Sequence, residues 1–419
     1  MISTPDQIGG DGRPDSGWSA LPLILALYGY EIVAPFLEFV GAGRGVSSIL
    51  RFGILAMTLC LLPRLGFRLS RASFLLLPFL CFALLYALRL IENHYLRGLV
   101  WADDPVRGLF LLVGAGVVPG VILATYSLRI SETRLFRAVL TCAAVYCVGL
   151  TLNLDTLAAQ VEFGQAALGK LNPISLGALS VSFALCLLLL PAQGQASAIT
   201  KWLVIGVLLA ATAYSQARGP LVSFGVTLAL MAILMRTKDR RAILGATVLL
   251  FGLVAILSAV SGQDMIGRAI GRFLLSSHDF ISADHDTASL RLVSWHVAWA
   301  QFLDHPFAGD IVYSRFLNQY PHNYLLESLI SVGVLGTTVL IVYLGLCGRA
   351  VLQIIRSHQV SRVDIVLIAL LIKEFTALQF SGAIWSGTAY IVLSFAVLVR
   401  SAYYRVPVTE RATRNFRYA

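Results

Sequence analysis

The sequence is poor in charged residues. Only 13% of its 419 residues are Asp, Glu, Lys or Arg, whereas 58% are hydrophobic. A water-soluble domain needs about 25% charged residues to cover its surface, so this composition excludes a soluble protein. The sequence also lacks internal repeats, low-complexity tracts and any segment with the composition of a soluble domain. We therefore expect an all-α polytopic membrane protein in which residues 1–419 form a single transmembrane domain.

Motifs for metal, nucleotide or disulfide chemistry are also missing. The six cysteines lie within apolar stretches, without the spacing of a disulfide framework or a zinc site. There is no nucleotide-phosphate loop. Asp284–His285–Asp286 is the nearest approach to a metal cluster, but three adjacent side chains cannot easily point at one ion. We therefore expect no metal and no cofactor.

Two further classes are disfavoured by how the charges are distributed. The net charge is +10, but the basic residues are scattered over short segments between apolar stretches, which argues against nucleic-acid binding. The first 18 residues are polar, rich in Gly and Pro, and nearly free of Lys and Arg. They do not resemble a cleaved signal, so we expect the first apolar segment to be retained.

Twelve apolar stretches are long enough, or nearly so, to cross a bilayer as helices. They predict about 12 transmembrane helices, with both termini on one side. The stretches are 19–40, 46–62, 73–90, 106–126, 134–152, 172–190, 198–214, 220–236, 242–260, 323–347, 364–380 and 383–402.

The basic residues predict the orientation of these helices. With the N-terminus inside, the inner segments contain 20 Lys and Arg residues and the longer outer segments contain nine. Enrichment of Lys and Arg is typical of cytoplasmic segments, so we expect both termini in the cytoplasm.

One outer segment is much longer than the other connections. Residues 261–322 separate the ninth and tenth predicted helices, and a connection of this length is usually functional. The segment contains helix-like pieces at 264–275 and 288–303. In the second piece Arg291 and Trp295 share a face, and we expect Trp299 and Phe302 at the bilayer interface.

Histidine and arginine are the main candidates for chemistry. Six of seven histidines lie on the predicted outer side, which weakly favours chemistry there; they are His94, His278, His285, His296, His305 and His322. Arg218 lies in the short outer turn SQARGP and Arg291 in the outer amphipathic piece. A guanidinium suits phosphate oxygens, although each arginine would equally serve as an interfacial anchor.

His322 lies where the long outer segment meets the next apolar helix. Partial burial at this boundary would bring its pKa near neutrality, and Asn323 can cap the helix that follows. The alternative is a histidine at a helix start without a task. Charged residues within the apolar stretches, such as Glu31, Arg51 and the Lys373–Glu374 pair, more often serve structural pairing.

Several motifs together resemble the O-antigen ligase family and its O-antigen polymerase and oligosaccharyltransferase relatives. The spacing of the last two motifs around the large outer loop is the most specific feature. The motifs are NPISLG at 172–177, QARGP at 216–220, the run from Arg291 through Trp295 to HPFAG at 305–309, and PHN at 321–323 followed by Gly333 and Gly336.

The resemblance implies a metal-independent glycosyltransferase at the periplasmic face of the bacterial inner membrane. It would transfer a glycan from undecaprenyl pyrophosphate to lipid A–core oligosaccharide. The resemblance makes His322 the catalytic residue and Arg218 and Arg291 the pyrophosphate ligands. We add four further candidates for the site, which are Gln216, Asn323, His305 and Trp295.

Two alternatives stay open at this point. The first is an O-antigen polymerase or a protein O-oligosaccharyltransferase, which differ from the ligase in the acceptor. The second is a lipid-linked glycan transporter. Transporters commonly place charged sites near mid-membrane between internal repeats, whereas the candidate residues here gather at the outer boundary. A glycosyl pyrophosphate is an activated donor, so two arginines and a histidine would meet the needs of transfer.

Overall fold

The computed structural model describes residues 20–41, 45–65, 71–99, 105–156, 172–215, 217–235, 240, 245, 252, 287–315, 319–357 and 360–404. Within these ranges the protein is helical and contains no strand, as the sequence predicts. The principal helices are α1 (Leu21–Phe39), α2 (Gly45–Leu59), α4 (Leu77–Ile91), α6 (Val118–Tyr126), α7 (Glu132–Thr151), α9 (Pro173–Leu189), α10 (Gln195–Ser215), α11 (Arg218–Leu234), α14 (Thr287–Asp304), α15 (Tyr324–Arg356), α16 (Arg362–Leu378) and α17 (Thr388–Tyr404).

Short helical turns extend or connect these helices. They are α3 (Leu62–Leu65), η2 (Arg71–Leu76), η3 (Glu92–Leu96), α5 (Pro105–Leu109), η4 (Phe110–Val117), η5 (Ser127–Arg129) and η6 (Ile384–Ser386). As a result α4 and η3 belong to one apolar helix over Phe74–Leu96, and α5, η4, α6 and η5 belong to another over Pro105–Arg129.

Helix starts follow local sequence signals. The side chain of Asn172 accepts the backbone N–H of Ser175 at 2.7 Å, and Pro173 occupies the first position of α9. Asn323 caps α15 in the same way, through the N–H of Leu326 at 2.9 Å. Such caps satisfy amide groups that have no partner within the helix, which matters most near lipid.

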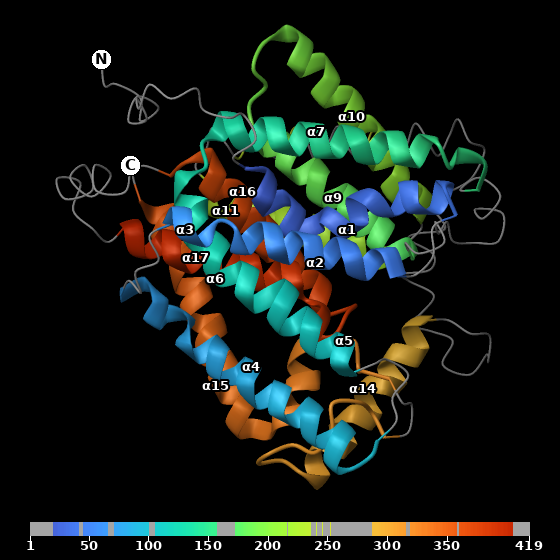
Figure 1. Cartoon of the computed structure of the whole chain (residues 1–419), viewed down its shortest axis with the longest axis vertical. Helices are drawn as coiled ribbons and strands as arrows, with labels where there is room; N and C mark the ends of the chain where they lie inside the picture. Colours follow the sequence, from blue (N-terminus) through green and yellow to red (C-terminus); the bar gives the residue numbers. More distant parts are fainter. Residues whose placement is uncertain are drawn as a thin grey trace.

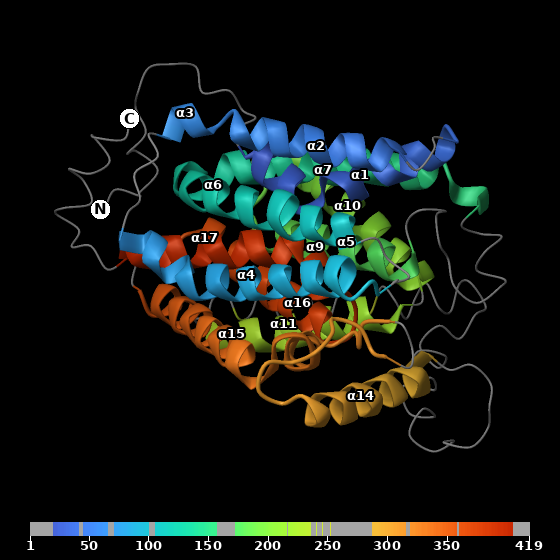
Figure 2. The ribbon, with the colours of Figure 1, turned by 60° about the horizontal axis from the view of Figure 1, so that its bottom comes forward.

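Helix α17 lies at the centre of the bundle. Its residues from Tyr390 to Ser401 are buried, because α6, α15 and α16 pack around it. A helix that is apolar on all sides is expected in such a position. Figure 1 shows α4 and α15 side by side along one flank, with α10 projecting at the opposite flank. Figure 2 shows the long helices running in roughly one direction, with α14 set apart at one end.

Eleven of the twelve predicted apolar stretches coincide with these helices, and the twelfth, 242–260, lies almost wholly outside the described residues. Six helices in the described part are long and apolar enough to cross a membrane, and four shorter ones are apolar. The number of spans and their orientation stay predictions. The outer piece 264–275 also lies outside the described residues.

Of the charged residues within the helices, Lys373 and Glu374 are paired as predicted for a structural role, whereas Arg51 contacts an aromatic ring. Lys373 Nζ lies 2.9 Å from Glu374 Oε1, which also accepts the Tyr28 hydroxyl at 2.9 Å. The guanidinium of Arg51 lies 4.6 Å from the centre of the Tyr30 ring. The Lys373–Glu374 pair neutralises charge that would be costly to leave alone in an apolar surrounding.

Helix α15 is broken at Gly333, whose φ of 63° is left-handed. The carbonyl of Ile330 accepts the N–H of Asp310 at 2.8 Å, and the N–H of Val334 donates to the carbonyl of Pro306 at 2.8 Å. The segment 305–310 thus supplies hydrogen bonds that the helix itself has lost. A Cβ at position 333 would collide with the backbone of Phe307, so only glycine fits.

Candidate functional site

Helix α14 and the start of α15 bring the predicted outer-loop residues together. The indole N–H of Trp295 donates to the carbonyl of Pro321 at 2.8 Å and so ties α14 to the PHN turn. Arg291 lies one turn earlier on the same face of α14, as predicted. Ala298 and Phe302 continue this face and pack against Ile330 of α15. The prediction that Phe302 lies at the bilayer interface was therefore wrong, because its ring packs between the two helices.

His322 occupies an unusual position in the chain. Its φ of 53° is left-handed. Among the described residues, no other residue apart from glycines has a positive φ. The imidazole is half-buried, and its Nδ1 atom is buried without a hydrogen-bond partner. Buried polar atoms normally have partners, and backbone strain of this kind is concentrated at functional sites.

Aromatic residues form a wall beside the imidazole. The ring of Tyr320 lies 4.4 Å from that of His322, centre to centre, in an edge-on arrangement. Tyr320 in turn contacts Tyr313 and Trp385, with ring centres 6.1 Å and 6.3 Å away. This wall limits how far the imidazole can rotate and shields one side of it from water.

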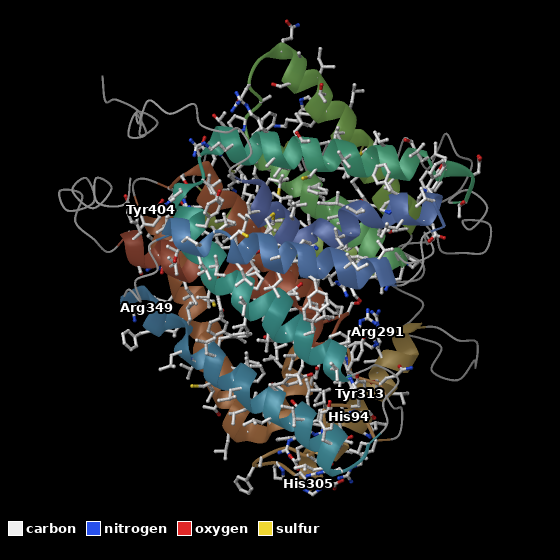
Figure 3. The ribbon with its side chains drawn as sticks, in the orientation of Figure 1. His94, Arg291, His305, Tyr313, Arg349 and Tyr404 are labelled. Carbon is white, nitrogen blue, oxygen red and sulfur yellow. The ribbon has the colours of Figure 1, made fainter. Side chains whose placement is uncertain are left out.

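The surroundings favour a neutral imidazole. Burial lowers the pKa of His322 below its ordinary value of 6.5, and the positive charge of Arg291 lowers it further. Both causes disfavour the imidazolium, so His322 is uncharged at neutral pH and has a ring nitrogen that can accept a proton. Arg291 therefore lies close enough to affect the protonation of His322, although Arg291 belongs to α14 and His322 to the turn before α15. Figure 3 shows Arg291 near one end of α14.

Asn323 holds the turn between two helices. Besides capping α15, its side-chain amide donates to the carbonyl of Gln379, at the end of α16, over 3.5 Å. Its own carbonyl accepts the N–H of Glu327 at 2.8 Å. Asn323 therefore fixes the backbone next to His322, and its structural role as a cap is as predicted.

Glu327 is a buried acid that the sequence analysis did not single out. It lies in the first turn of α15, fully buried, and accepts the Tyr86 hydroxyl at 2.6 Å. Both carboxylate oxygens also accept the N–H of Ile384 at 3.1 Å. Glu327 thus joins α4, α15 and η6 directly beneath the PHN turn. The sequence pattern that could have revealed Glu327 is an acidic residue inside an apolar helix, five residues after His322.

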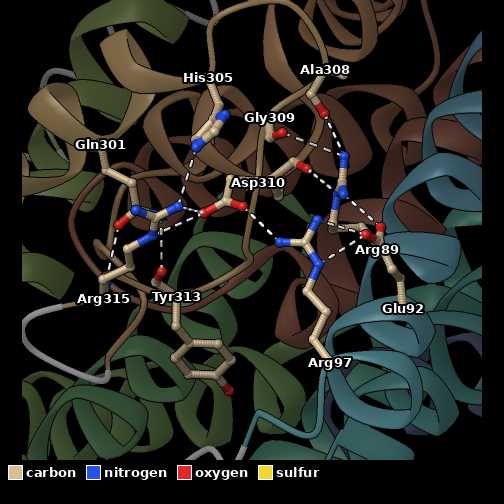
Figure 4. Close-up of polar contacts among 11 residues, drawn as sticks. Arg89, Glu92, Arg97, Gln301, His305, Ala308, Gly309, Asp310, Tyr313 and Arg315 are labelled. Atoms are coloured by element: carbon tan, nitrogen blue, oxygen red, sulfur yellow. Dashed lines mark hydrogen bonds and ion pairs between the residues drawn. The ribbon is translucent and has the colours of Figure 1, made fainter.

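His305 does not join His322. Figure 3 shows Arg291 and His305 at opposite ends of α14, about 20 Å apart at 1.5 Å per residue. His305 belongs to a second polar cluster, drawn in Figure 4. Its Nε2 lies 3.2 Å from a guanidinium nitrogen of Arg315, which is also bonded to Asp310.

The second cluster links the HPFAG segment to the end of α4. Asp310 is buried between Arg315 and Arg97, and Arg97 also bonds Glu92 at 2.7 Å. Burial acts to raise the pKa of Asp310, but its bonds to the two arginines outweigh burial and hold the pKa below its usual value. The bond to Asp310 likewise raises the pKa of Arg97. The charged groups of this cluster have partners of opposite charge within the protein, which favours a structural role.

Arg89 of α4 adds further hydrogen bonds between α4, α15 and the segment 305–310. Its Nε donates to the carbonyl of Ser331 at 2.9 Å, and a terminal nitrogen donates to the carbonyl of Ala308 at 2.7 Å. The carbonyl of Ser331 lacks its usual helical partner because of the break at Gly333. Arg89 therefore replaces a backbone donor with a side chain. Sequence alone does not reveal this role, since Ser331 lies 242 residues away.

The two motifs around residues 172–177 and 216–220 lie against each other. Gly177 of α9 has no space for a side chain, since a Cβ there would lie 2.7 Å from Ser215 Oγ and 3.0 Å from Pro220. The backbone of Arg218 begins α11, but its side chain and Gln216 lie outside the described residues. Helix α11 packs along α16, whose end contacts Asn323.

The arrangement suits proton acceptance next to a bound anion. A neutral imidazole with an unpaired ring nitrogen can accept a proton, and Arg291 supplies a permanent positive charge nearby. No group of three or more His, Cys, Asp or Glu side chains that would hold a metal ion occurs among the described residues. Metal independence itself stays a prediction.

Comparison with known proteins bears on the middle of the chain. No curated protein matches the sequence. Residues 202–310 match the family model described as O-antigen ligase. The matched segment runs from α10 through Arg218 and Arg291 to the HPFAG motif, and so includes two of the four motifs that carried the resemblance. With its apolar helices the chain is a multi-pass membrane protein, and over residues 202–310 it is similar to the O-antigen ligase family.

Proposed function

We propose that this protein is an O-antigen ligase of the bacterial inner membrane. It transfers a glycan from undecaprenyl pyrophosphate to lipid A–core oligosaccharide at the periplasmic face, with both termini in the cytoplasm. His322 is the catalytic base, and Arg218 and Arg291 bind the pyrophosphate. The family match over residues 202–310 supports the class of reaction, and the surroundings of His322 support the assignment of the base.

The observation that carries the proposal is the buried, unpaired Nδ1 of His322. Most structural histidines pair their ring nitrogens or expose them to water. Here the ring is held by Tyr320 and kept neutral by burial and by Arg291. We assign this unpaired atom as the one that accepts the proton of the acceptor hydroxyl.

The reaction requires one proton transfer and one substitution. The acceptor hydroxyl oxygen forms a bond to the anomeric carbon of the donor, while the bond from that carbon to the pyrophosphate oxygen breaks. The hydroxyl proton passes to His322 as the new bond forms. The electron pair of the broken bond leaves on undecaprenyl pyrophosphate, and Arg218 and Arg291 stabilise this added negative charge. His322 then releases its proton to water.

The direct test is a reaction with purified protein in detergent. The donor is a glycan on undecaprenyl pyrophosphate, and lipid A–core and a second glycan-linked lipid are offered as competing acceptors. We expect product on lipid A–core. Extension of the glycan-linked lipid would instead identify a polymerase. Absence of any product, with movement of the donor across sealed vesicles, would identify a transporter. Chelators of divalent ions should leave the reaction intact.

The orientation is tested separately with reporter fusions. Fusions after Arg241 and after Arg405 should report the cytoplasm, and a fusion near Asp284 should report the periplasm. A cytoplasmic signal at Asp284 would place His322 on the wrong side for lipopolysaccharide assembly and so contradict the proposal.

A further inference from the structure

The outer face of α14 is largely apolar, whereas its inner face contains polar side chains beside the apolar Ala298 and Phe302. The face toward the bundle contains Arg291, Ser294 and Gln301, and the last two are buried. The opposite face exposes Leu292, Trp299 and Leu303, with exposed fractions of 44%, 48% and 58%. A helix packed on a water-soluble surface turns its apolar side inward and its polar side outward. Helix α14 departs from this pattern, because it exposes large apolar side chains along its outer face.

The exposed apolar residues form a single stripe. Positions 292, 299 and 303 are separated by seven and four residues, which places them on one side of a helix. His296 lies within this stripe and is exposed, and Asp304 lies at its end. A stripe of this kind favours an interface over the hydrocarbon centre, because the imidazole and the carboxylate need polar partners.

The stripe continues onto the surface of a spanning helix. Phe307, with 75% of its surface exposed, follows the end of α14 and accepts the N–H of Leu335 through its carbonyl at 3.2 Å. Leu335 is 66% exposed and belongs to α15, one of the six helices suited to cross a membrane. An exposed leucine on such a helix faces lipid. The apolar side of α14 therefore runs directly into a lipid-facing surface.

We propose that α14 lies in the lipid–water interface, with Leu292, Trp299, Leu303 and Phe307 in contact with a phospholipid leaflet. The helix then holds its other face, and with it Arg291, at the depth of the lipid headgroups. Resting on the proposed function, this depth is where the pyrophosphate of a lipid-linked donor lies. The membrane surface is thus a second partner that positions the arginine.

The test uses spin labels in the full-length protein reconstituted in phospholipid nanodiscs. The six native cysteines are first replaced, and one new cysteine is introduced per variant. Leu303→Cys reports on α14, Leu335→Cys is the lipid-facing control, and Gln193→Cys, in an exposed turn, is the water-facing control. Collision of the label with oxygen measures contact with lipid, and collision with a water-soluble nickel chelate measures contact with water.

We expect the label at position 303 to behave like that at 335, with frequent oxygen collisions and loss of nickel collisions relative to position 193. Nickel collisions equal to those at 193 would place α14 in water and overturn the proposal. Poor access to both reagents would show that protein covers the stripe, either another segment of this chain or a second copy, and would overturn it equally.

A functional measurement separates this proposal from the assignment of the reaction. Leu303→Glu should raise the KM for the lipid-linked donor, whereas Leu303→Ile should not. If the wild-type protein transfers no glycan, the proposed function fails and the spin-label result still decides the position of α14. If transfer occurs and the label at 303 faces water, only the membrane contact fails.

Discussion

Two buried polar clusters in this molecule differ in how completely they are bonded. One cluster joins α16, α17 and η5, where Asp364 binds Arg400 and accepts the hydroxyl groups of Ser361 and Tyr404, both at 2.5 Å. Arg400 also donates to the carbonyl of Ser127 at 2.6 Å. The other cluster surrounds His322. There, a ring nitrogen is buried without a partner.

The difference separates a structural cluster from a reactive one. Every charge in the Asp364 cluster is neutralised within the protein, which is what stability requires of buried ions. The His322 cluster leaves a basic atom unsatisfied beside a positive charge, which stability alone would disfavour. Figure 3 shows that the two clusters lie far apart, with Tyr404 on one side of the molecule and Arg291 on the other. Substitutions should therefore affect folding at one and chemistry at the other.

The largest expected effect is on the rate of transfer at His322. His322→Ala removes the base and should lower turnover by about 10²–10⁴ while leaving donor binding nearly unchanged. The measurement is transfer by purified protein together with a donor-binding assay. His322→Gln can form a hydrogen bond but cannot accept a proton. Near-normal turnover of this variant would reject the base role of His322. A loop carboxylate such as Asp284 or Asp286 would then be the candidate base.

The matching substitution in the structural cluster should act on stability. Asp364→Ala leaves Arg400 buried without its counterion, and breaking a buried pair in this way costs about 3–5 kcal/mol. Thermal unfolding in detergent should show this loss, while transfer per folded molecule stays normal. The double variant Asp364→Leu with Arg400→Met removes both charges and should recover much of the stability. If the folded fraction of Asp364→Ala lost turnover, the assignment of a purely structural role to the Asp364 cluster would be wrong.

Arg218 and Arg291 should show an intermediate effect on donor use. Charge-assisted hydrogen bonds contribute about 1.5–3 kcal/mol each, so either Ala variant should lose at least about tenfold in kcat/KM. Lys keeps the charge but not the planar fork and should rescue only partly. Arg315→Ala is the control, because its guanidinium belongs to the Asp310 cluster. Full activity of Arg291→Ala would remove this arginine from the site.

The pH dependence tests the coupling between Arg291 and His322. The base must be neutral, so transfer should decline as pH falls through the pKa of His322, which lies below 6.5. Arg291→Gln removes the positive charge that helps to lower this pKa, so the acidic limb should move to higher pH. The movement should be partial, because burial is the larger cause and persists. Normalised pH profiles of the two proteins give the answer, and identical acidic limbs would refute the coupling.

The smallest effect is expected at Asp310. Asp310→Asn weakens its bonds to Arg97 and Arg315, but both guanidinium groups reach water and can be hydrated there. Ion pairs of this exposure contribute about 0–1 kcal/mol, so we expect a slight decrease in unfolding temperature and little change in turnover. Since the pKa of Asp310 is lowered in the folded protein, its contribution is present above the usual value near 3.8 and lost as pH falls below it. A decrease in turnover as large as that of His322→Ala would place this cluster in the site.

Much of the fold and part of the site follow from local sequence patterns. Eleven of the predicted apolar stretches coincide with helices in the structure, because length and hydropathy decide which segments can enter a bilayer. The common face of Arg291 and Trp295, and the cap formed by Asn323, depend only on helix spacing and on the residue at the helix start.

Contacts between distant segments were beyond the sequence analysis. The bond from Tyr86 to Glu327 joins residues 241 apart, and that from Arg97 to Asp310 joins residues 213 apart. Phe302 was misplaced for a related reason. A large ring on an amphipathic helix suits either lipid or a neighbouring helix, and only the position of Ile330 decides between them.

The break in α15 has a consequence for the mobility of segment 305–310. The N–H groups of Val334 and Leu335 bond to the carbonyl groups of Pro306 and Phe307. If segment 305–310 moved away, these amides would be left in an apolar surrounding, where each unsatisfied group costs several kcal/mol. The segment therefore cannot act as a lid.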